Sequence, residues 1–338
     1  MPRSSPIRLL AAGFALGAAL LTAGAASGAS SCQLATIGTL PVELKGWSPT
    51  TEGSVNGQPI MAVVDTGSML TALTRKFAQR VSLDLRETEA SAAGVESAQG
   101  VGGHSFVYSA HINELAFGPL VAKDVYVGVL SVLDEKLPGD GFLGADLLLA
   151  RDLEMALQKG EIRVLIPDGC HDEFLAYWDR EASVVPMSRL SRRDHRQVIT
   201  LQINDTDVRA MIDSGASRSV IDTASAARLG VTRESSKILA EDSAGGVGPK
   251  RVDTWVASFR KVVIGRETIH DTELAVADLR SGFRQDADTT TRIKRRSDLG
   301  FDMLLGADFL KSHRVLFSVK QERFYFSYVG GHIFATDH

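Results

Sequence analysis

Apolar runs of strand length recur along the chain, and most of them end at a turn rich in Gly, Asn or Asp. Asn56-Gly57 lies between two such runs, which is a strong signal for a β-hairpin. Thr74 is expected to cap a short helix with Phe77 and Ala78 on its apolar face. The expected elements are a strand over 40–44, the apolar run that ends at Asp65, the helix after Thr74, strands over 106–112 and 121–130, and a short helix after the block 141–148. The first half is therefore predicted to be rich in β-strands.

The second half repeats this order of elements, as an internal duplication predicts. Strands are expected over 198–203 and 208–212, on either side of a turn at Asn204-Asp205. Asp222 takes the place of Thr74 as a helix cap, 148 residues further along the chain. The other recurring segments are a glycine-containing stretch at 97–103 and 243–248, and an apolar block at 141–148 and 302–310. The chain is therefore predicted to contain two homologous β-rich halves.

The repeat sets the predicted domain bounds. They are a signal peptide over 1–30, a first domain over 38–168, a linker over 169–195, a second domain over 196–330 and a tail over 331–338.

The N-terminus differs from the rest of the chain in its pattern. Arg3 and Arg8 precede an uncharged run rich in Leu and Ala, which ends in small residues near 25–29. This layout is typical of a secretory signal, with an uncleaved membrane anchor as the alternative. No other stretch approaches the length of a membrane span. We therefore expect an exported, periplasmic protein with no membrane span after signal removal.

The chain has two cysteines, Cys32 and Cys170. Exported cysteines are expected to pair in an oxidising compartment. A disulfide would tie the start of the mature chain to the segment between the halves. Lipid attachment at Cys32 is the alternative, although the preceding residues lack the usual Leu.

Composition and charge exclude some partners. The 338 residues are 44% hydrophobic and 23% charged, as in a globular protein with one or two cores. The net charge of −4 argues against a nucleic-acid-binding surface over the whole protein. The histidines show no ligand spacing, so neither a metal nor a cofactor is expected. The basic cluster at 292–296 is interpreted as part of a solvated surface loop, with a local anionic partner as the alternative.

Two apolar strands each run into an acid, a small hydroxyl residue and a glycine. They are Asp65-Thr66-Gly67-Ser68 and Asp213-Ser214-Gly215-Ala216. One copy alone is weak evidence, because an Asp after a strand is commonly a turn former. The duplicated context favours two carboxylates that lie face to face. Such a pair can share one proton, activate a water and protonate a leaving group.

At these residues the chain resembles the aspartic protease superfamily, and within it the retropepsin-like branch found in bacteria. The resemblance covers nearly the whole mature chain and depends on three linked signals per copy: the acid loop, the glycine-rich segment and the apolar block. It implies a mostly all-β fold with two closed β-barrel domains in tandem, related by a pseudo-two-fold axis, and short helices. A monomer would then hold a complete site, with pairing of halves between chains as the alternative.

The resemblance also implies roles for the residues around Asp65 and Asp213. Thr66 and Ser214 would hydrogen-bond across the axis, and the glycine segments would close as flaps over an extended peptide. The flap residues are Gly100, Val101, Gly102, Gly103, Gly245, Gly246, Val247 and Gly248, and those packed behind the acids are Leu143, Gly144, Leu305 and Gly306. Asp146 and Asp308 are expected to cap the short helix that closes each half.

The two copies differ at Ser68 and Ala216. By resemblance to pepsin-like enzymes, the Ser68 hydroxyl would donate to the outer oxygen of Asp65 and favour its ionised form. The hypothesis is that Asp65 is the more readily ionised acid.

The predicted function is an aspartic endopeptidase that hydrolyses peptide bonds of periplasmic or envelope polypeptides, with selective or regulatory cleavage. Asp65 and Asp213 are the predicted catalytic pair. The alternative is a non-catalytic peptide-binding module that keeps the fold.

Overall fold

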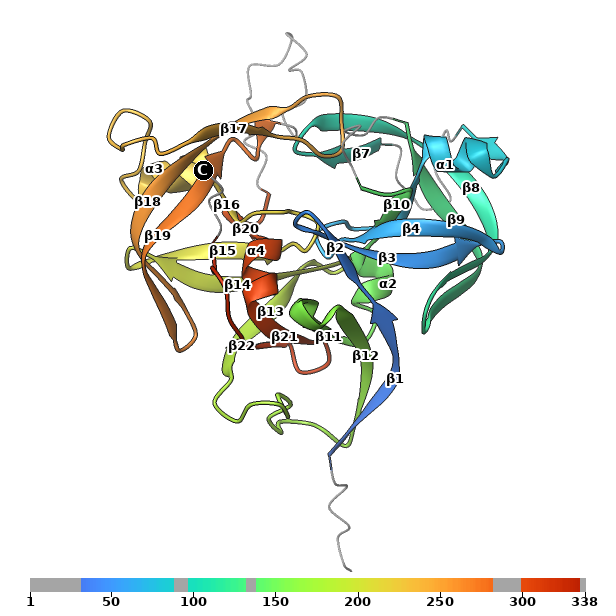
Figure 1. Ribbon diagram of the computed structural model, residues 1–338, viewed down its shortest axis with the longest axis horizontal. Helices are drawn as coiled ribbons and strands as arrows, with labels where there is room; N and C mark the ends of the chain where they lie inside the picture. The colour runs from blue at the N-terminus through green and yellow to red at the C-terminus, as the bar shows by residue number, and fades with distance from the viewer. Residues whose placement is uncertain (1–31, 88–96, 132–137, 282–298, 335–338) are drawn as a thin grey trace, which may run out of the picture. The chain divides into compact units, whose positions relative to one another are not determined.

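A computed structural model describes residues 32–87, 97–131, 138–281 and 299–334 of the chain (Figure 1). The predicted signal peptide at 1–30, the basic cluster at 292–296 and the end of the predicted tail lie outside the described residues.

The first half closes into a ring of six strands, because β3 pairs with β8 as well as with β4. In ring order the strands are β3 (Ser48–Val55), β4 (Gln58–Val64), β10 (Gly141–Leu143), β5 (Ala72–Thr74), β9 (Leu120–Leu130) and β8 (Gly103–Phe117). Strands β2 (Glu43–Lys45), β6 (Leu85–Arg86) and β7 (Ser97–Gly100) extend the ring at its margins. The Asn56-Gly57 hairpin predicted from the sequence joins β3 to β4.

The second half forms a matching ring, closed by pairing of β14 with β18. In the same order its strands are β14 (Asp194–Ile203), β15 (Thr206–Ile212), β20 (Met303–Leu305), β16 (Val220–Asp222), β19 (Glu267–Ala277) and β18 (Val252–Ile264). β17 (Glu241–Ala244) pairs with β18 as β7 pairs with β8. The prediction of tandem closed β-domains is confirmed.

A central sheet joins the two rings. Its order is β1 (Gln33–Pro41), β12 (Glu161–Asp168), β11 (Asp152–Ala156), β21 (His313–Ser318), β22 (Arg323–Tyr328) and β13 (Ser183–Ser191). At its centre Glu154 lies opposite Leu316. The flanking pairs Leu153–Phe317 and Met155–Val315 are exchanged by a two-fold rotation about this central pair. The pseudo-two-fold axis therefore passes through the β11–β21 pair. The segment 169–195, predicted as a linker, contributes β13 to this sheet; the exact domain bounds stay predictions.

Short helices follow the strands at corresponding places in both halves. They are α1 (Arg75–Arg80), α2 (Ala145–Leu148), α3 (Thr223–Arg228) and α4 (Ala307–Ser312), with a 3₁₀ turn, η1 (Leu157–Lys159), after β11. The predicted caps at Thr74 and Asp222 are confirmed, since their side chains accept bonds from the N–H groups of Phe77 and Ala224. The predicted caps at Asp146 and Asp308 are wrong. Glycine occupies both N-cap positions, and the two acids face the acid loops instead.

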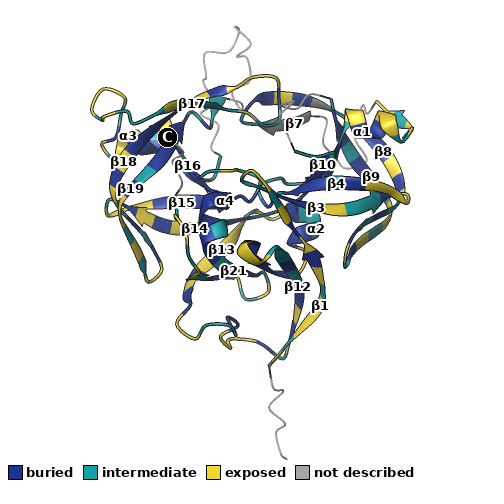
Figure 2. Ribbon diagram, viewed as in Figure 1, coloured by how far each residue is buried: buried dark blue, intermediate teal, exposed yellow. Residues whose placement is uncertain are grey.

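One apolar core runs through both rings and the central sheet (Figure 2). It contains fully buried aromatic side chains from each part, such as Phe117, Phe259 and Phe317. Burial of such side chains is the dominant favourable term in folding. The two halves therefore share a single packed interior, which fixes one acid loop relative to the other.

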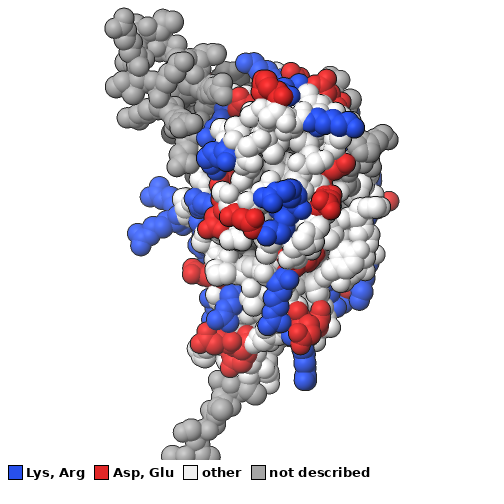
Figure 3. Space-filling model, turned by 90° about the vertical axis from the view of Figure 1, so that its left-hand side faces the viewer, with Lys and Arg blue, Asp and Glu red and all other residues white. Residues whose placement is uncertain are grey.

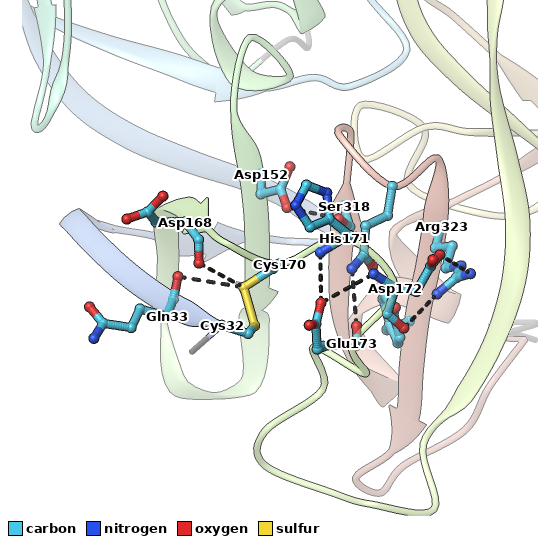
Figure 4. Close-up of a disulfide and its surroundings, with 12 residues drawn as sticks. Cys32, Gln33, Asp152, Asp168, Cys170, His171, Asp172, Glu173, Ser318 and Arg323 are labelled. Atoms are coloured by element: carbon cyan, nitrogen blue, oxygen red, sulfur yellow. Dashed lines mark hydrogen bonds and ion pairs between the residues drawn. A yellow bond between two sulfur atoms is a disulfide. The ribbon is translucent and has the colours of Figure 1, made fainter. Parts of the chain in front are cut away.

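The structure joins Cys32 and Cys170 in a disulfide with an S–S distance of 2.09 Å. Figure 4 shows the bond between the start of β1 and the segment that follows β12. Because β1 is the edge strand of the central sheet, the bond fixes the start of the described chain to the end of the first half.

Replacing both cysteines with Ser is expected to lower the free energy of unfolding by about 3–5 kcal/mol, because the bond closes a long loop of the unfolded chain. Urea titration of the double variant measures the change. Wild-type protein unfolded in the presence of dithiothreitol should show the same loss. Equal stability of the variant and the oxidised wild type would contradict the prediction.

Two surface features bear on partners. On the face shown in Figure 3, basic and acidic side chains are interspersed rather than gathered into a field of one sign. Among the described residues, no helix is long and apolar enough to cross a membrane.

Candidate active site

Each acid loop begins where a buried strand ends. β4 and β15 run parallel to β10 and β20, and the N–H groups of Asp65 and Asp213 donate to the carbonyls of Leu143 and Leu305, each at 2.9 Å. The apolar blocks thus act as the structural support predicted for them.

Each carboxyl group accepts two backbone N–H bonds on one oxygen. For Asp65, the donors are Gly67 and Ser68 at 2.9 and 2.8 Å. For Asp213, the donors are Gly215 and Ala216 at 2.9 and 3.0 Å. These bonds fix the plane of each carboxyl group.

Thr66 and Ser214 lock the loops together by reciprocal hydrogen bonds. The Thr66 hydroxyl accepts from the N–H of Ser214 at 3.0 Å and donates to the carbonyl of Ile212 at 2.9 Å. The Ser214 hydroxyl accepts from the N–H of Thr66 at 3.0 Å and donates to the carbonyl of Val64 at 2.7 Å. The structure thus contains the cross-axis bonds that the resemblance implies, and both hydroxyl residues are fully buried.

The two carboxyl groups face each other across the glycines. A Cβ atom added to Gly67 would lie 2.2 Å from Cγ of Asp213, and one added to Gly215 would lie 2.3 Å from Cγ of Asp65. Burial raises the pKa of Asp65 well above its ordinary value, and the neighbouring Asp213 raises it further. Burial also raises the pKa of Asp213, against the opposing N–H bond from Ala216. Two carboxyls this close share one proton across a wide pH range.

A second layer of polar side chains supports the loops from behind. Thr71 donates its hydroxyl to Asp146 and accepts the N–H of Gly144, while Ser219 makes the same bonds with Asp308 and Gly306. A Cβ atom at Gly144 or Gly306 would lie 2.5 Å from the backbone of the acid loop. Thr71 and Ser219 were not predicted from the sequence, although they share the spacing of the two acids.

The predicted flaps form two hairpins whose tips touch. The N–H of Lys250 donates to the carbonyl of Gly102 at 3.0 Å, and Gly248 packs against Gly102. Val101 packs on an apolar cluster of the second half that includes Leu304, and Val247 packs on one of the first half that includes Phe142. Each tip therefore crosses the site to the opposite half. Of the other predicted flap residues, Gly100, Gly245 and Gly246 line the enclosed space and Gly103 lies at the turn into β8.

The flaps and acid loops enclose a cavity of about 910 Å³ that contains both acids. The first half contributes apolar residues such as Leu70, Leu130 and Phe142 to its lining. The second half contributes three cations, Arg196, Arg218 and Arg251, together with Glu241 and Asp242. These lining residues were not predicted from the sequence, because the direction of their side chains depends on the closure of the rings and not on local pattern.

The hypothesis for Ser68 is wrong. Its hydroxyl donates to the carbonyl of Leu70 at 2.9 Å, and its contact with Asp65 is through the backbone N–H, as at Ala216. A charged side chain that acts on Asp213 is Arg196 on β14, which Asp194 holds through bonds of 2.6 to 3.0 Å. Its positive charge acts to lower the pKa of Asp213, against the larger effect of burial. The hydrogen bond between the two carboxyl groups raises the pKa of Asp65 and lowers that of Asp213, so Asp213 is the more readily ionised acid.

Arg196→Gln is expected to move the acidic limb of the pH profile of activity to higher pH. The acidic limb follows the ionisation of the more acidic member of the pair, and loss of a nearby positive charge raises the pKa of that carboxyl. Ser68→Ala is the matched control and should leave this limb in place. A limb that moves with Ser68→Ala and not with Arg196→Gln would contradict the assignment. The measurement is kcat/KM on one peptide from pH 2 to 8.

Among the described residues, no group of three or more His, Cys, Asp or Glu side chains is arranged to hold a metal ion. The absence of metals and cofactors stays a prediction.

Comparison with known proteins supplies a family for this arrangement. A family model described as aspartyl protease matches residues 51–147 and 199–309, one match in each ring. The chain is 30% identical over 121 residues to Protein DDI1 homolog 2 of Xenopus laevis, and 29% identical over 121 residues to that of Mus musculus. The matched region is 36% of this chain and 28% of each relative, so it spans under a third of their length.

Proposed function

We propose, from the premise that this chain belongs to the aspartyl protease family, that it is an endopeptidase with Asp65 and Asp213 as its catalytic pair. The observation that supports the proposal is the pair of carboxyl groups related by the pseudo-two-fold axis. Each is held by two N–H bonds and packs over the glycine of the opposite loop. A water and a scissile carbonyl can meet between two acids held in this way.

The proposed reaction uses one proton on the pair. Ionised Asp213 takes a proton from the water as its oxygen attacks the carbonyl carbon, and protonated Asp65 donates its proton to the carbonyl oxygen. The product of this step is a tetrahedral diol, and the pair again holds one proton. Asp213 then gives its proton to the leaving nitrogen while Asp65 takes one from the diol, and the C–N bond breaks. The pair returns to its starting state.

The substrate is proposed to be an extended polypeptide under the two flaps. The cavity has apolar walls, and β7 and β17, which line it, are edge strands that each pair with one neighbour. Such edges bind an extended chain by main-chain hydrogen bonds. Because Val101 and Val247 pack across the site, the flaps must separate before a peptide enters.

A synthetic peptide library, analysed by mass spectrometry after incubation with the purified protein, tests the proposal. We expect cleavage at internal peptide bonds, with the shared feature of each site read from the new termini. Binding of peptides without any cleavage would instead support the alternative, a peptide-binding module. Loss of both binding and cleavage would exclude both readings.

We also propose that the protein is exported to the periplasm, acts there as a monomer and cuts a limited set of envelope polypeptides. The residues at 1–30 have the pattern of a secretory signal, and a disulfide persists in an oxidising compartment. Both acids come from one chain, so a second copy adds nothing to the pair. Recovery of the tagged protein from the cytoplasmic fraction, or activity only in a dimer on sedimentation, would contradict these points.

A further inference from the structure

A row of three small residues crosses the cavity wall in the first half. Ala72 on β5 pairs with Gly128 on β9, and Gly128 pairs with Ser109 on β8. All three residues line the cavity. Phe142, the antiparallel partner of Ala72, lines it as well and lies at one end of the row.

The equivalent row in the second half carries larger side chains. Its residues pair in the same order and also line the cavity: Val220, Ala275 and Val256. Valine takes the place of alanine and of serine, and alanine takes the place of glycine. The wall of the first half is therefore recessed where the wall of the second half is filled.

The backbone does not require a glycine at position 128. Its φ angle lies outside the left-handed region. Among the described residues, an added Cβ atom would meet one atom within 4 Å, Cγ1 of Val107 at 3.2 Å. Glycine within a strand costs stability relative to a residue with a side chain. The room that Gly128 leaves in the cavity is therefore a functional reason for a residue that the strand does not favour.

Apolar side chains enclose this recess. Leu130 stands in the next row along the same strands, where the second half has the smaller Ala277. Leu130 and Phe142 belong to one apolar cluster with Ala72, and Val247 of the opposite flap packs on that cluster. The first half thus forms a deep apolar pocket that is closed at one end and covered by a flap. The second half forms a shallower and more open one.

A peptide that passes between the acids meets the two pockets on opposite sides of the scissile bond, because each pocket belongs to the half that carries one acid. We propose that the recess at Gly128 is the subsite for a large apolar side chain, such as Phe, Leu or Met, and that the symmetric subsite in the second half takes a smaller one. Gly128, with Ala72 and Ser109, determines this difference in size. The inference rests on the proposed endopeptidase function.

The test begins with cleavage of a degenerate peptide library by the wild-type protein. Phe, Leu or Met should be enriched at one position on a single side of the cleaved bond, and smaller residues at the symmetric position on the other side. The best sequence is then resynthesised with Ala in place of the large residue. We expect kcat/KM for the original peptide to exceed that for the Ala peptide about tenfold or more, because the recess is left unfilled.

Substitutions on the two walls separate pocket size from fold. Gly128→Ala and Gly128→Val should lower this kcat/KM ratio in steps, the second at least about tenfold, because the added atoms occupy the recess. The matched control is the double variant Ala275→Gly with Val256→Ser. It should leave the ratio in place and allow a large side chain at the symmetric position. Each ratio compares two peptides on one protein preparation, so a partly unfolded variant does not distort it.

Two kinds of outcome overturn the inference in different ways. Cleavage without a one-sided enrichment of large side chains, or a ratio that survives Gly128→Val, removes the role of the recess and leaves the endopeptidase function standing. No cleavage of any library peptide by the wild-type protein removes the proposed function and this inference with it.

Discussion

Asp65→Asn and Asp213→Asn are each expected to lower kcat/KM for peptide hydrolysis by about 10⁴-fold or more. Members of a catalytic unit act together, so loss of one removes nearly the whole effect of the unit. An amide can neither take the proton from the water nor complete the return of the pair to its starting state. The measurement is hydrolysis of one fluorogenic peptide by each variant. A single variant with near-normal activity would exclude the shared-proton mechanism.

The same variants are expected to be more stable than the wild-type protein at neutral pH. Both acids have folded-state pKa values raised above their ordinary value, chiefly by burial. The folded protein therefore binds more protons than the unfolded chain, and stability falls as pH rises from the ordinary pKa toward the raised one. Replacement of either acid removes this loss, so the gain in melting temperature should be larger at pH 7 than at pH 4.

Glu173 provides the opposite case as a control. Backbone N–H groups, its own first, hold its pKa below the ordinary value, and its carboxylate accepts the N–H of His171 at 2.6 Å (Figure 4). Glu173→Gln should not raise the melting temperature at pH 7. A gain for Glu173→Gln as large as that for the catalytic variants would show that reduced net charge, and not the buried pair, is the cause.

Gly67→Ala is expected to lower kcat/KM at least about 100-fold and to destabilise the fold by about 1–3 kcal/mol. Its new methyl carbon would lie 2.2 Å from Cγ of Asp213, far inside any van der Waals contact. The loops must move apart, which stretches the Thr66–Ser214 bonds and separates the two carboxyls. A peptide assay gives the first effect and urea unfolding the second.

Gly246→Ala is the matched control for the unfolding measurement, because a Cβ atom there meets no atom within 4 Å. Its free energy of unfolding should stay within about 0.5 kcal/mol of the wild-type value. If Gly67→Ala were equally mild, the two carboxyls would not be packed against the glycines as the structure has them.

The parts of the fold that depend on local pattern were predictable from the sequence. The Asn56-Gly57 hairpin and the caps at Thr74 and Asp222 follow from turn and cap chemistry within a few residues. The duplication then supplied the long-range statement that Asp65 and Asp213 lie together. Each of these inferences needed only residue type and spacing.

The predictions for Ser68, Asp146 and Asp308 were wrong because each of these side chains has more than one hydrogen-bond partner within reach. Ser68 donates to Leu70, two residues away, because the tight loop brings that carbonyl within reach. Asp146 and Asp308 accept from Thr71 and Ser219 across the fold, where burial makes an unpaired hydroxyl costly. Sequence spacing does not determine which acceptor a hydroxyl reaches, and it does not determine which strand residues line a cavity.

The central sheet bears on how the amino-acid sequences of the two halves can diverge during evolution. Among the described strands, β11 and β21 are the one pair that joins first-half to second-half residues in the sheet. In a homodimer with this arrangement, any substitution appears in both subunits, so both ends of the binding site must change together. Here one chain carries both copies, and selection can act on each separately. Leu70 and Arg218, which lie at equivalent positions of the two halves and both line the cavity, are an example of such divergence.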